Sequence, residues 1–172
     1  MKRNAMQQEL LSLAGGANTL AVQLLGNPDD AADAVQDSLL AVLSKPRSYK
    51  ARKGPLRPWF LRVVRNRCID LIRQRRPVDD VLETLADPGD TPEEALAQGQ
   101  RDEALQVALR ALEHDQREIV VLREFLDLSY AEIGAVLELP PGTVMSRLHR
   151  ARLALIARLS AAGDVDDEGG SI

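Results

Sequence analysis

The sequence is poor in aromatic residues and contains a single cysteine. Aromatic side chains make up 3% of the 172 residues, whereas apolar residues together make up 45%. A core must therefore consist mainly of Leu, Val and Ala, which favours packed helices. Cys68 has no second cysteine with which to pair, which excludes an intrachain disulfide and indicates a reducing compartment.

Long hydrophobic runs are also missing. No apolar stretch approaches the ~20 residues that a membrane-spanning helix needs, and the first residues lack the apolar segment of a signal peptide. His114 and His149 lie in separate expected helices, without the spacing of a catalytic triad or a metal site. We therefore expect a cytoplasmic protein without membrane contact that is not an enzyme, with no catalytic residues, no metal and no cofactor.

The net charge of −4 conceals a strong segregation of charge along the chain. Residues 44–76 contain twelve Lys or Arg residues and one acid, whereas residues 77–103 contain nine acids and one base. Four more acids follow Gly163. A basic block in a weakly acidic chain predicts a site for a polyanion, and nucleic acid is the most common polyanion. On charge alone, a solvated basic face is an equally open interpretation.

Apolar residues recur at helical spacing almost throughout, and no segment alternates as a strand does. The sequence therefore predicts an all-α fold. In the first half we expect helices at 7–25, 28–43 and 58–76, with a basic loop at 45–54. In the second half we expect a helix that begins at Pro92 and further helices at 115–125, 130–137 and 141–161.

The acidic segment between the two halves contains Pro88-Gly89 and shows little periodicity, which indicates a linker. We expect two small helical domains joined by this flexible acidic linker, with a helix-turn-helix in the C-terminal domain. The bounds are 5–76 for the first domain, 77–92 for the linker, 93–161 for the second domain and 162–172 for a disordered acidic tail.

The helix-turn-helix consists of a short helix, a break at 138–140 and a longer basic helix. The short helix begins with a capping box formed by Ser129 and Glu132. One arc of the longer helix carries hydroxyls and guanidiniums, which contact base edges and phosphates in a major groove. These residues are Thr143, Ser146, Arg147 and Arg150. An amphipathic helix with ordinary surface arginines is the alternative.

The helix expected at 28–43 has an acidic face that includes an apolar residue. This face consists of Asp33, Gln36, Asp37 and Leu40. An exposed leucine among acids favours a basic protein partner, while a solvated acidic stripe is the alternative.

The helix expected at 58–76 has a buried stripe and an opposite polar face. The stripe consists of Phe60, Leu61, Val64, Cys68, Leu71 and Ile72. The polar face includes Trp59, Arg62, Asn66 and Arg73. An aromatic ring beside guanidiniums and an amide suits contacts to an unpaired nucleic-acid strand. Core packing at the start of the helix is an equally open role for Trp59, and we expect Cys68 to be a core residue.

Several of these segments resemble one family. Gly142-Thr143-Val144, Ser146-Arg147-Leu148 and Arg150-Ala151-Arg152 look like region four of extracytoplasmic-function sigma factors in the sigma-70 family. Residues 33–37 are similar to the acidic polymerase-binding motif of the family, and residues 59–76 to its minus-ten melting segment. The loop at 44–58 resembles its specificity loop, with Tyr49 as the candidate for stacking on a flipped-out base. Val42-Leu43 departs from the family, in which tryptophan is frequent there.

The resemblance implies an alternative sigma factor that binds core RNA polymerase and directs promoter recognition, DNA melting and transcription initiation. The helix expected at 141–161 would bind the minus-thirty-five duplex, and the first domain would bind the polymerase and the minus-ten strand. An anti-sigma factor is a further candidate partner. Two alternatives stay open: a helix-turn-helix regulator that acts without polymerase, and a sigma mimic that sequesters an anti-sigma factor.

Overall fold

The computed structural model describes the backbone of residues 2–75 and 92–167 and the side chains of residues 2–75 and 99–161. These residues form helices joined by short connections, and no strand occurs among them. The predicted all-α fold is therefore confirmed. The predicted linker at 77–92 lies outside the described residues except for Pro92, which begins a helix.

Three α-helices form the N-terminal half, namely α1 (Lys2–Leu25), α2 (Pro28–Ser44) and α3 (Leu56–Gln74). Gly26, with a φ of 70°, ends α1 in the left-handed region. The Asn27 side chain accepts hydrogen bonds from the backbone N–H groups of Asp29 and Asp30, which fixes the start of α2 at Pro28. Two short 3-10 turns, η1 (Pro46–Ser48) and η2 (Ala51–Lys53), connect α2 to α3.

Two helix starts in this half differ from the prediction. Helix α1 begins at Lys2 rather than at residue 7, and α3 begins at Leu56 rather than at Pro58. Pro58 lies in the first turn of α3, where its missing N–H has no intrahelical partner to lose, so the proline does not mark the boundary. Helix α3 ends at Gln74, two residues before the predicted end.

The C-terminal half contains α4 (Pro92–Ala111), α5 (His114–Val120), α6 (Tyr130–Leu137) and α7 (Pro141–Asp167). Helix α5 continues into a π-helical segment, η3 (Val121–Phe125). The capping box of Ser129 and Glu132 is present, as predicted. Helix α7 continues to Asp167 instead of ending at residue 161, so the tail predicted to be disordered from 162 begins inside a helix. A single glycine in a helix costs only about 1 kcal/mol, and Gly163 therefore does not end it.

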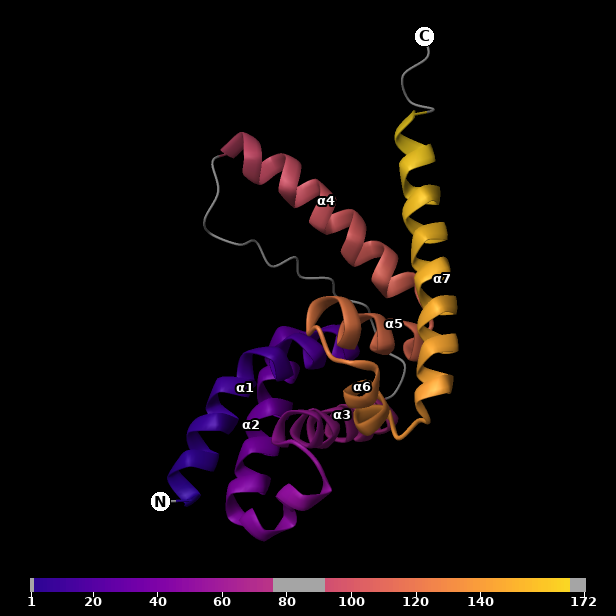
Figure 1. Cartoon of the computed structure of the whole chain (residues 1–172). Coiled ribbons are helices and arrows are strands. Elements are labelled where there is room, and N and C mark those ends of the chain that lie inside the picture. The colour runs from indigo at the N-terminus through magenta and orange to yellow at the C-terminus, as the bar shows by residue number, and fades with distance from the viewer. Residues whose placement is uncertain (1, 76–91, 168–172) are drawn as a thin grey trace.

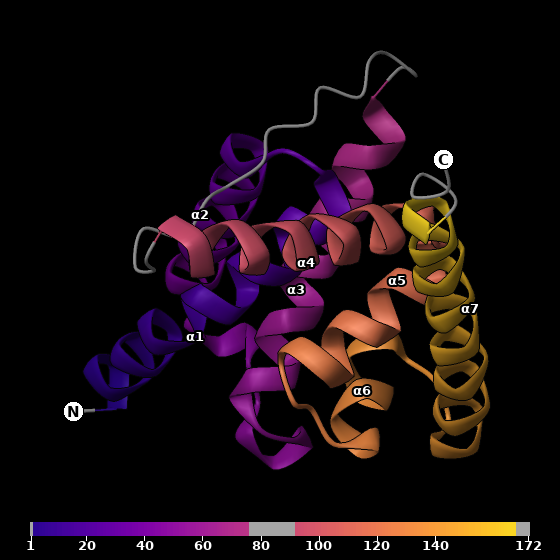
Figure 2. The same cartoon turned by 90° about the horizontal axis from the view of Figure 1, so that it is seen from above.

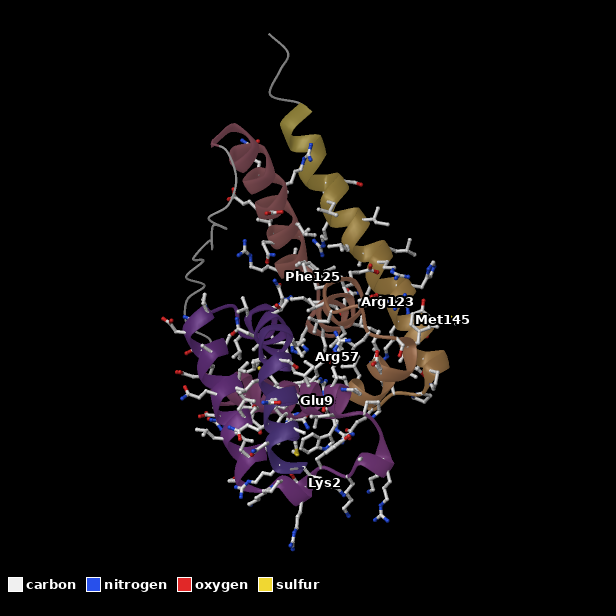
Figure 3. The ribbon with its side chains drawn as sticks, turned by 60° about the vertical axis from the view of Figure 1, so that its left-hand side comes forward. Lys2, Glu9, Arg57, Arg123, Phe125 and Met145 are labelled. Carbon is white, nitrogen blue, oxygen red and sulfur yellow. The ribbon has the colours of Figure 1, made fainter. Side chains whose placement is uncertain are left out.

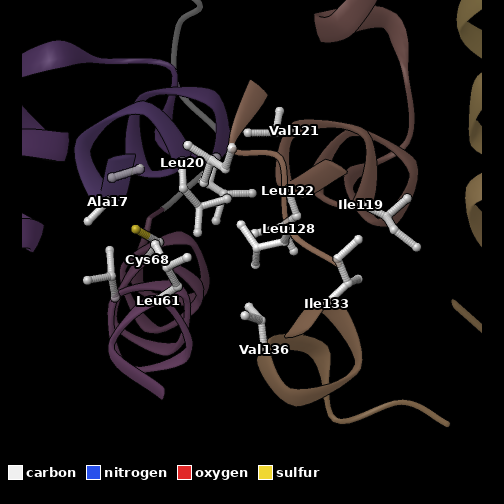
Figure 4. Close-up of a cluster of buried hydrophobic side chains, with 14 of the residues drawn as sticks. Ala17, Leu20, Leu61, Cys68, Ile119, Val121, Leu122, Leu128, Ile133 and Val136 are labelled. Atoms are coloured by element: carbon white, nitrogen blue, oxygen red, sulfur yellow. The ribbon is translucent and has the colours of Figure 1, made fainter. Parts of the chain in front are cut away.

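Figures 1 and 2 show α1 and α2 on one side of the molecule and α7 on the other, with α3, α5 and α6 between them. The two halves share a hydrophobic core. In Figure 4, Leu20 and Leu61 of the N-terminal half lie near Leu122 and Leu128 of the C-terminal half, and all four side chains are buried. We call this junction of α1 and α3 with α5, η3 and α6 the seam.

None of the helices in residues 2–75 and 92–167 combines the length and the apolar character that crossing a bilayer requires.

Candidate nucleic-acid and polymerase interface

The turn between α6 and α7 places the start of α7 at the surface. Helix α6 ends at Leu137, and its C-cap residue, Glu138, adopts the left-handed conformation with a φ of 57°. The backbone N–H of Leu139 then donates to the carbonyl of Gly134 at 3.0 Å. Val144 and Leu148 are buried beneath α7 and fix its orientation on the domain. The predicted helix-turn-helix is therefore present in the structure.

The four predicted duplex-binding residues of α7 lie together on one face. Ser146, Arg147 and Arg150 are exposed, and Thr143 is half-buried. The Ser146 hydroxyl donates to the Thr143 carbonyl at 3.1 Å, and Arg150 Nε donates to the Ser146 carbonyl at 3.4 Å. The arc thus presents two guanidiniums near a helix N-terminus, an arrangement that suits contacts to an anionic groove.

All four residues predicted for the acidic face of α2 are exposed, namely Asp33, Gln36, Asp37 and Leu40. Leu40 has an exposed fraction of 60%, although it is a large apolar residue. Asp37 Oδ2 accepts from Arg67 of α3 at 3.1 Å. The ion pair leaves Asp33, the second acid of this face, available to a basic partner.

A shallow groove of about 530 Å³ runs between α2 and α3. Asp37 and Leu40, predicted to bind a protein, line it together with Asn66, predicted to bind a nucleic-acid strand. Val63, Arg67 and Asp70 complete the α3 wall of the groove. The structure thus brings two separately predicted sites to one continuous surface. Arg67 was not selected from the sequence, although it belongs to the basic block.

The aromatic residues of the basic loop and of α3 contact each other. The rings of Tyr49 and Trp59 have centroids 5.2 Å apart and an interplanar angle of 50°. The Tyr49 hydroxyl donates to the Gly54 carbonyl at 2.9 Å. Both rings are half-buried and pack against the core, so Trp59 combines core packing with a surface edge. Arg73 is exposed farther along the helix.

The seam engages part of the basic face of α3. Arg62 Nη1 lies 3.7 Å from Glu138 Oε1 of the turn. Arg65 Nε donates to Glu118 Oε1 of α5 at 2.7 Å. Neither Arg65 nor Glu118 was predicted from the sequence as a site residue. An acid inside the otherwise apolar segment 118–122 was the available signal, because an acid is almost never fully buried without a partner.

Burial perturbs two titratable groups near these surfaces. It raises the pKa of the Cys68 thiol from 9.0 to about 11, although nearby Arg67 and Arg75 act in the opposite direction. Cys68 is fully buried, which confirms its predicted place in the core. Burial also raises the pKa of the Glu118 carboxyl, an effect that the pairing with Arg65 opposes. Among the described residues, no group of three or more potential ligand side chains could hold a metal ion.

Comparisons with known families agree with this geometry. Residues 17–78 match the family model Sigma-70 region 2, and residues 102–155 match Sigma-70, region 4. The second match includes the helix-turn-helix, and the first includes α2, the basic loop and α3. The fold and the two family matches together define a transcription-initiation factor of the sigma-70 class.

Similarity to individual relatives indicates which group of this class the chain belongs to. The ECF RNA polymerase sigma factor EcfG of Rhodopseudomonas palustris is 31% identical over 169 residues, 95% of this chain and 90% of that protein. The ECF RNA polymerase sigma factor SigE of Mycolicibacterium smegmatis is 34% identical over 143 residues, 79% of this chain and 54% of that protein. The sigma factor RpoE from Bartonella quintana, solved in complex with the anti-sigma factor NepR, has a TM-score of 0.73 and 27% identity, covering 89% of this chain and 95% of that one.

The chain therefore belongs to the extracytoplasmic-function sigma factors, alternative sigma factors that direct RNA polymerase to promoters. The hypothesis drawn from the sequence is confirmed at this level, and a regulator that acts without polymerase is not favoured.

Proposed function

We propose that the two halves are separate functional modules, residues 5–76 and residues 93–161, joined by a linker at 77–92 and followed by a tail at 162–172. The first module binds core RNA polymerase through Asp33, Gln36, Asp37 and Leu40. It holds the melted minus-ten strand through Tyr49, Trp59, Arg62, Asn66 and Arg73. The second module binds the minus-thirty-five duplex through Thr143, Ser146, Arg147 and Arg150.

The groove between α2 and α3 is the observation that carries this proposal. Its α2 wall contributes an exposed leucine beside Asp37, and its α3 wall contributes Asn66 and Arg67. An apolar residue among acids fits a basic protein surface, whereas an amide and a guanidinium fit a strand of nucleic acid. Polymerase bound at one wall would therefore deliver melted DNA directly to the other.

Partners follow from the same assignment. The protein acts in the cytoplasm on core RNA polymerase and promoter DNA, without enzymatic activity of its own and without a cofactor. The solved complex of RpoE with NepR supports an anti-sigma factor as a further partner. Two weak modules that bind one promoter at once gain affinity from their linkage, so the spacing of the promoter elements contributes to specificity.

Run-off transcription with purified core polymerase tests the proposal. The protein should direct transcripts from its own promoter, and core polymerase alone should not. Asp33→Arg should abolish this activity, because it places a like charge against a basic polymerase surface. Arg3→Ala, an exposed change on α1, is the control and should have no effect. Transcription that persists in Asp33→Arg would contradict the assignment of the α2 face.

A further inference from the structure

The groove between α2 and α3 contains an acid in the most basic part of the chain. Asp70 is the single acid among residues 44–76, which include twelve Lys or Arg residues. Its side chain is exposed and lines the groove, and no other side chain in residues 2–75 and 99–161 pairs with it. A carboxylate repels phosphates, because like charges repel. If Asp70 contacts nucleic acid, the contact must therefore be to the bases rather than to the backbone.

Arginines on different faces of α3 have different partners. Arg57, at the centre of Figure 3, donates to the backbone carbonyl of Leu126 in the C-terminal half. Arg67 instead faces α2, where its Nη2 donates to Asp37 Oδ2 at 3.1 Å. This ion pair holds the Arg67 guanidinium at the groove. Because an arginine has five N–H donors, the pair leaves further donors of Arg67 for a ligand.

An amide and a carboxylate lie one helical turn apart on the α3 wall of the groove. Asn66 and Asp70 both line it and both are exposed. Residues four apart on a helix lie on the same face, with Cβ atoms about 5–6 Å apart. Val63 and Leu40 add apolar side chains to the same groove. The wall therefore combines hydrogen-bonding groups with apolar surface, as a planar ring with a polar edge requires.

The size of the groove also suits a nucleobase. Its volume of about 530 Å³ lies within the range of ~300–1,000 Å³ that is typical of small-ligand sites. The groove is shallow, so a base that remains attached to a strand can enter it from the side.

The same face of α3 carries residues proposed for the melted strand. Trp59, Asn66 and Arg73 recur every seven residues, which is about two helical turns, and Asp70 lies between the last two. A strand that follows this face from Trp59 to Arg73 therefore passes over the groove. Polymerase bound at the α2 wall would leave the α3 wall to the strand.

The hydrogen-bonding chemistry of this wall favours guanine. An ionised carboxylate such as that of Asp70 only accepts hydrogen bonds. Guanine alone among the four DNA bases offers two adjacent donors, N1–H and the N2 amino group, on the edge that unpairing exposes. Its O6 accepts, which suits the donors of Asn66 and Arg67. Cytosine offers one donor on this edge, and thymine has acceptors on both sides of its single donor.

We propose that the α3 wall of the groove is a binding site for an unpaired guanine. The Asp70 carboxylate accepts from N1–H and from the N2 amino group, while Asn66 or Arg67 donates to O6. Val63 packs against the ring. This inference rests on the proposed function, because the guanine belongs to the melted strand. The site is separate from Tyr49, the residue of the basic loop proposed to stack on a flipped-out base.

The test uses holoenzyme assembled from core polymerase and the full chain, with Asp70→Asn as the variant. This change keeps the shape of an exposed side chain and removes its charge. Asp127→Asn is the matched control, because it makes the same change at an exposed position outside the groove. Circular dichroism checks that both variants fold, and core polymerase alone gives the background.

The probes are single-stranded oligothymidylates of about 12 nucleotides. One probe is unmodified, and the others carry one internal guanine, cytosine or inosine. Inosine contains the guanine ring system without the N2 amino group, so it removes one of the two donors that Asp70 is expected to bind.

Filter binding measures the apparent Kd of each probe. Wild type and control should bind the guanine probe roughly ten-fold more tightly than the unmodified probe, since a bidentate base contact discriminates by about this factor. Inosine should lose most of this gain. In Asp70→Asn the preference for guanine over inosine should disappear. Affinity of this variant for the unmodified probe should stay equal or rise, because a charge that repels phosphate is gone.

The opposite directions of these two effects distinguish base recognition from other roles of Asp70. Weaker binding of every probe by Asp70→Asn would indicate a structural role. An unchanged guanine preference would indicate a solvated acid, and a preference of the wild type for cytosine would indicate a different base. Each of these three results would overturn the inference.

Guanosine monophosphate as a competitor tests the other source of the same base. Displacement of the guanine probe by an equal concentration of the nucleotide would assign the groove to a free nucleotide and overturn its place on the melted strand. Retention of the probe supports that place. Run-off transcription keeps the two proposals apart: transcripts without a guanine preference overturn only this inference, whereas wild-type chain that yields no transcripts overturns the proposed function and the strand site with it.

Discussion

The exposed arginines near the start of α7 are expected to contact promoter bases. Arg147→Ala or Arg150→Ala should weaken binding of the holoenzyme to its promoter by about 1–3 kcal/mol if the arginine forms a bidentate base contact. Arg158 is exposed on the same helix but farther from its N-terminus, so Arg158→Ala is the control and should have a much smaller effect. Promoter titrations by footprinting provide the measurement. An equal loss of promoter affinity in all three variants would mean that these arginines contribute only positive charge and no base contacts.

Burial makes the Cys68 thiol chemically inert in the folded protein. Because the thiolate is the reactive form and the pKa is raised to about 11, alkylation should be slow in the native chain and complete after denaturation. The folded-state pKa exceeds the unfolded value of 9.0, so stability from this thiol is present below pH 9.0 and is lost as the pH rises toward about 11. Mass spectrometry follows the alkylation.

The control for this pH dependence is the Cys68→Ala variant, which has no thiol to titrate. Its free energy of unfolding should vary less with pH above 9.0 than that of the wild type. Rapid alkylation of the native wild type at neutral pH would instead indicate that α3 opens frequently.

At the scale of elements, the turn between α6 and α7 depends on a close approach of two backbones. A Cβ atom on Gly134 would lie 2.7 Å from the carbonyl oxygen of Leu139 and 3.7 Å from Val144 Cγ2. Gly134→Val should lower the free energy of unfolding by about 1–3 kcal/mol, because the larger side chain forces the turn to shift. Gly15→Val in α1 meets no atom within 4 Å and should be nearly neutral. Urea denaturation measures the free energy of unfolding of both variants. An equal loss of stability in the two would refute the steric argument.

Helix boundaries could be predicted from the sequence where a local interaction fixes them. The starts of α2 and α6 were correct because Asn27 and Ser129 cap them with their own side chains. The start of α3 was wrong because Pro58 is tolerated in a first turn as well as before one. The π-helical segment was not predicted at all, since no residue type marks the i→i+5 hydrogen bond that the Leu126 N–H donates to the Val121 carbonyl.

At the scale of the whole molecule, the candidate surfaces could be predicted but their mutual placement could not. Periodicity correctly assigned the exposed faces of α2 and α7, because it follows from the geometry of one helix. The pairing of Arg65 with Glu118 joins residues 53 positions apart. The periodicity of one helix does not indicate which other helix it packs against. The shared core and the seam therefore required the structure.

Free protein should bind promoter duplex poorly and become specific only with core polymerase. Residues 104–163 contain seven basic and seven acidic residues, so the second module attracts phosphate weakly. Neutralisation of phosphates dominates non-specific affinity, and the seam already engages Arg62 and Arg65 of the basic block. Gel-shift titrations with and without core polymerase measure the difference. Tight, sequence-specific binding by the protein alone would favour the independent regulator.

The contact of Tyr49 with Trp59 also provides an intrinsic fluorescence probe. Trp59 is the single tryptophan of the chain and lies half-buried at the junction of the basic loop and α3. Indole emission depends on the polarity around the ring and is quenched by stacked bases, so the intrinsic fluorescence of the protein originates from one informative position. Addition of DNA can therefore be followed without a dye, and a change in tryptophan emission reports on that junction, because the chain has no second tryptophan.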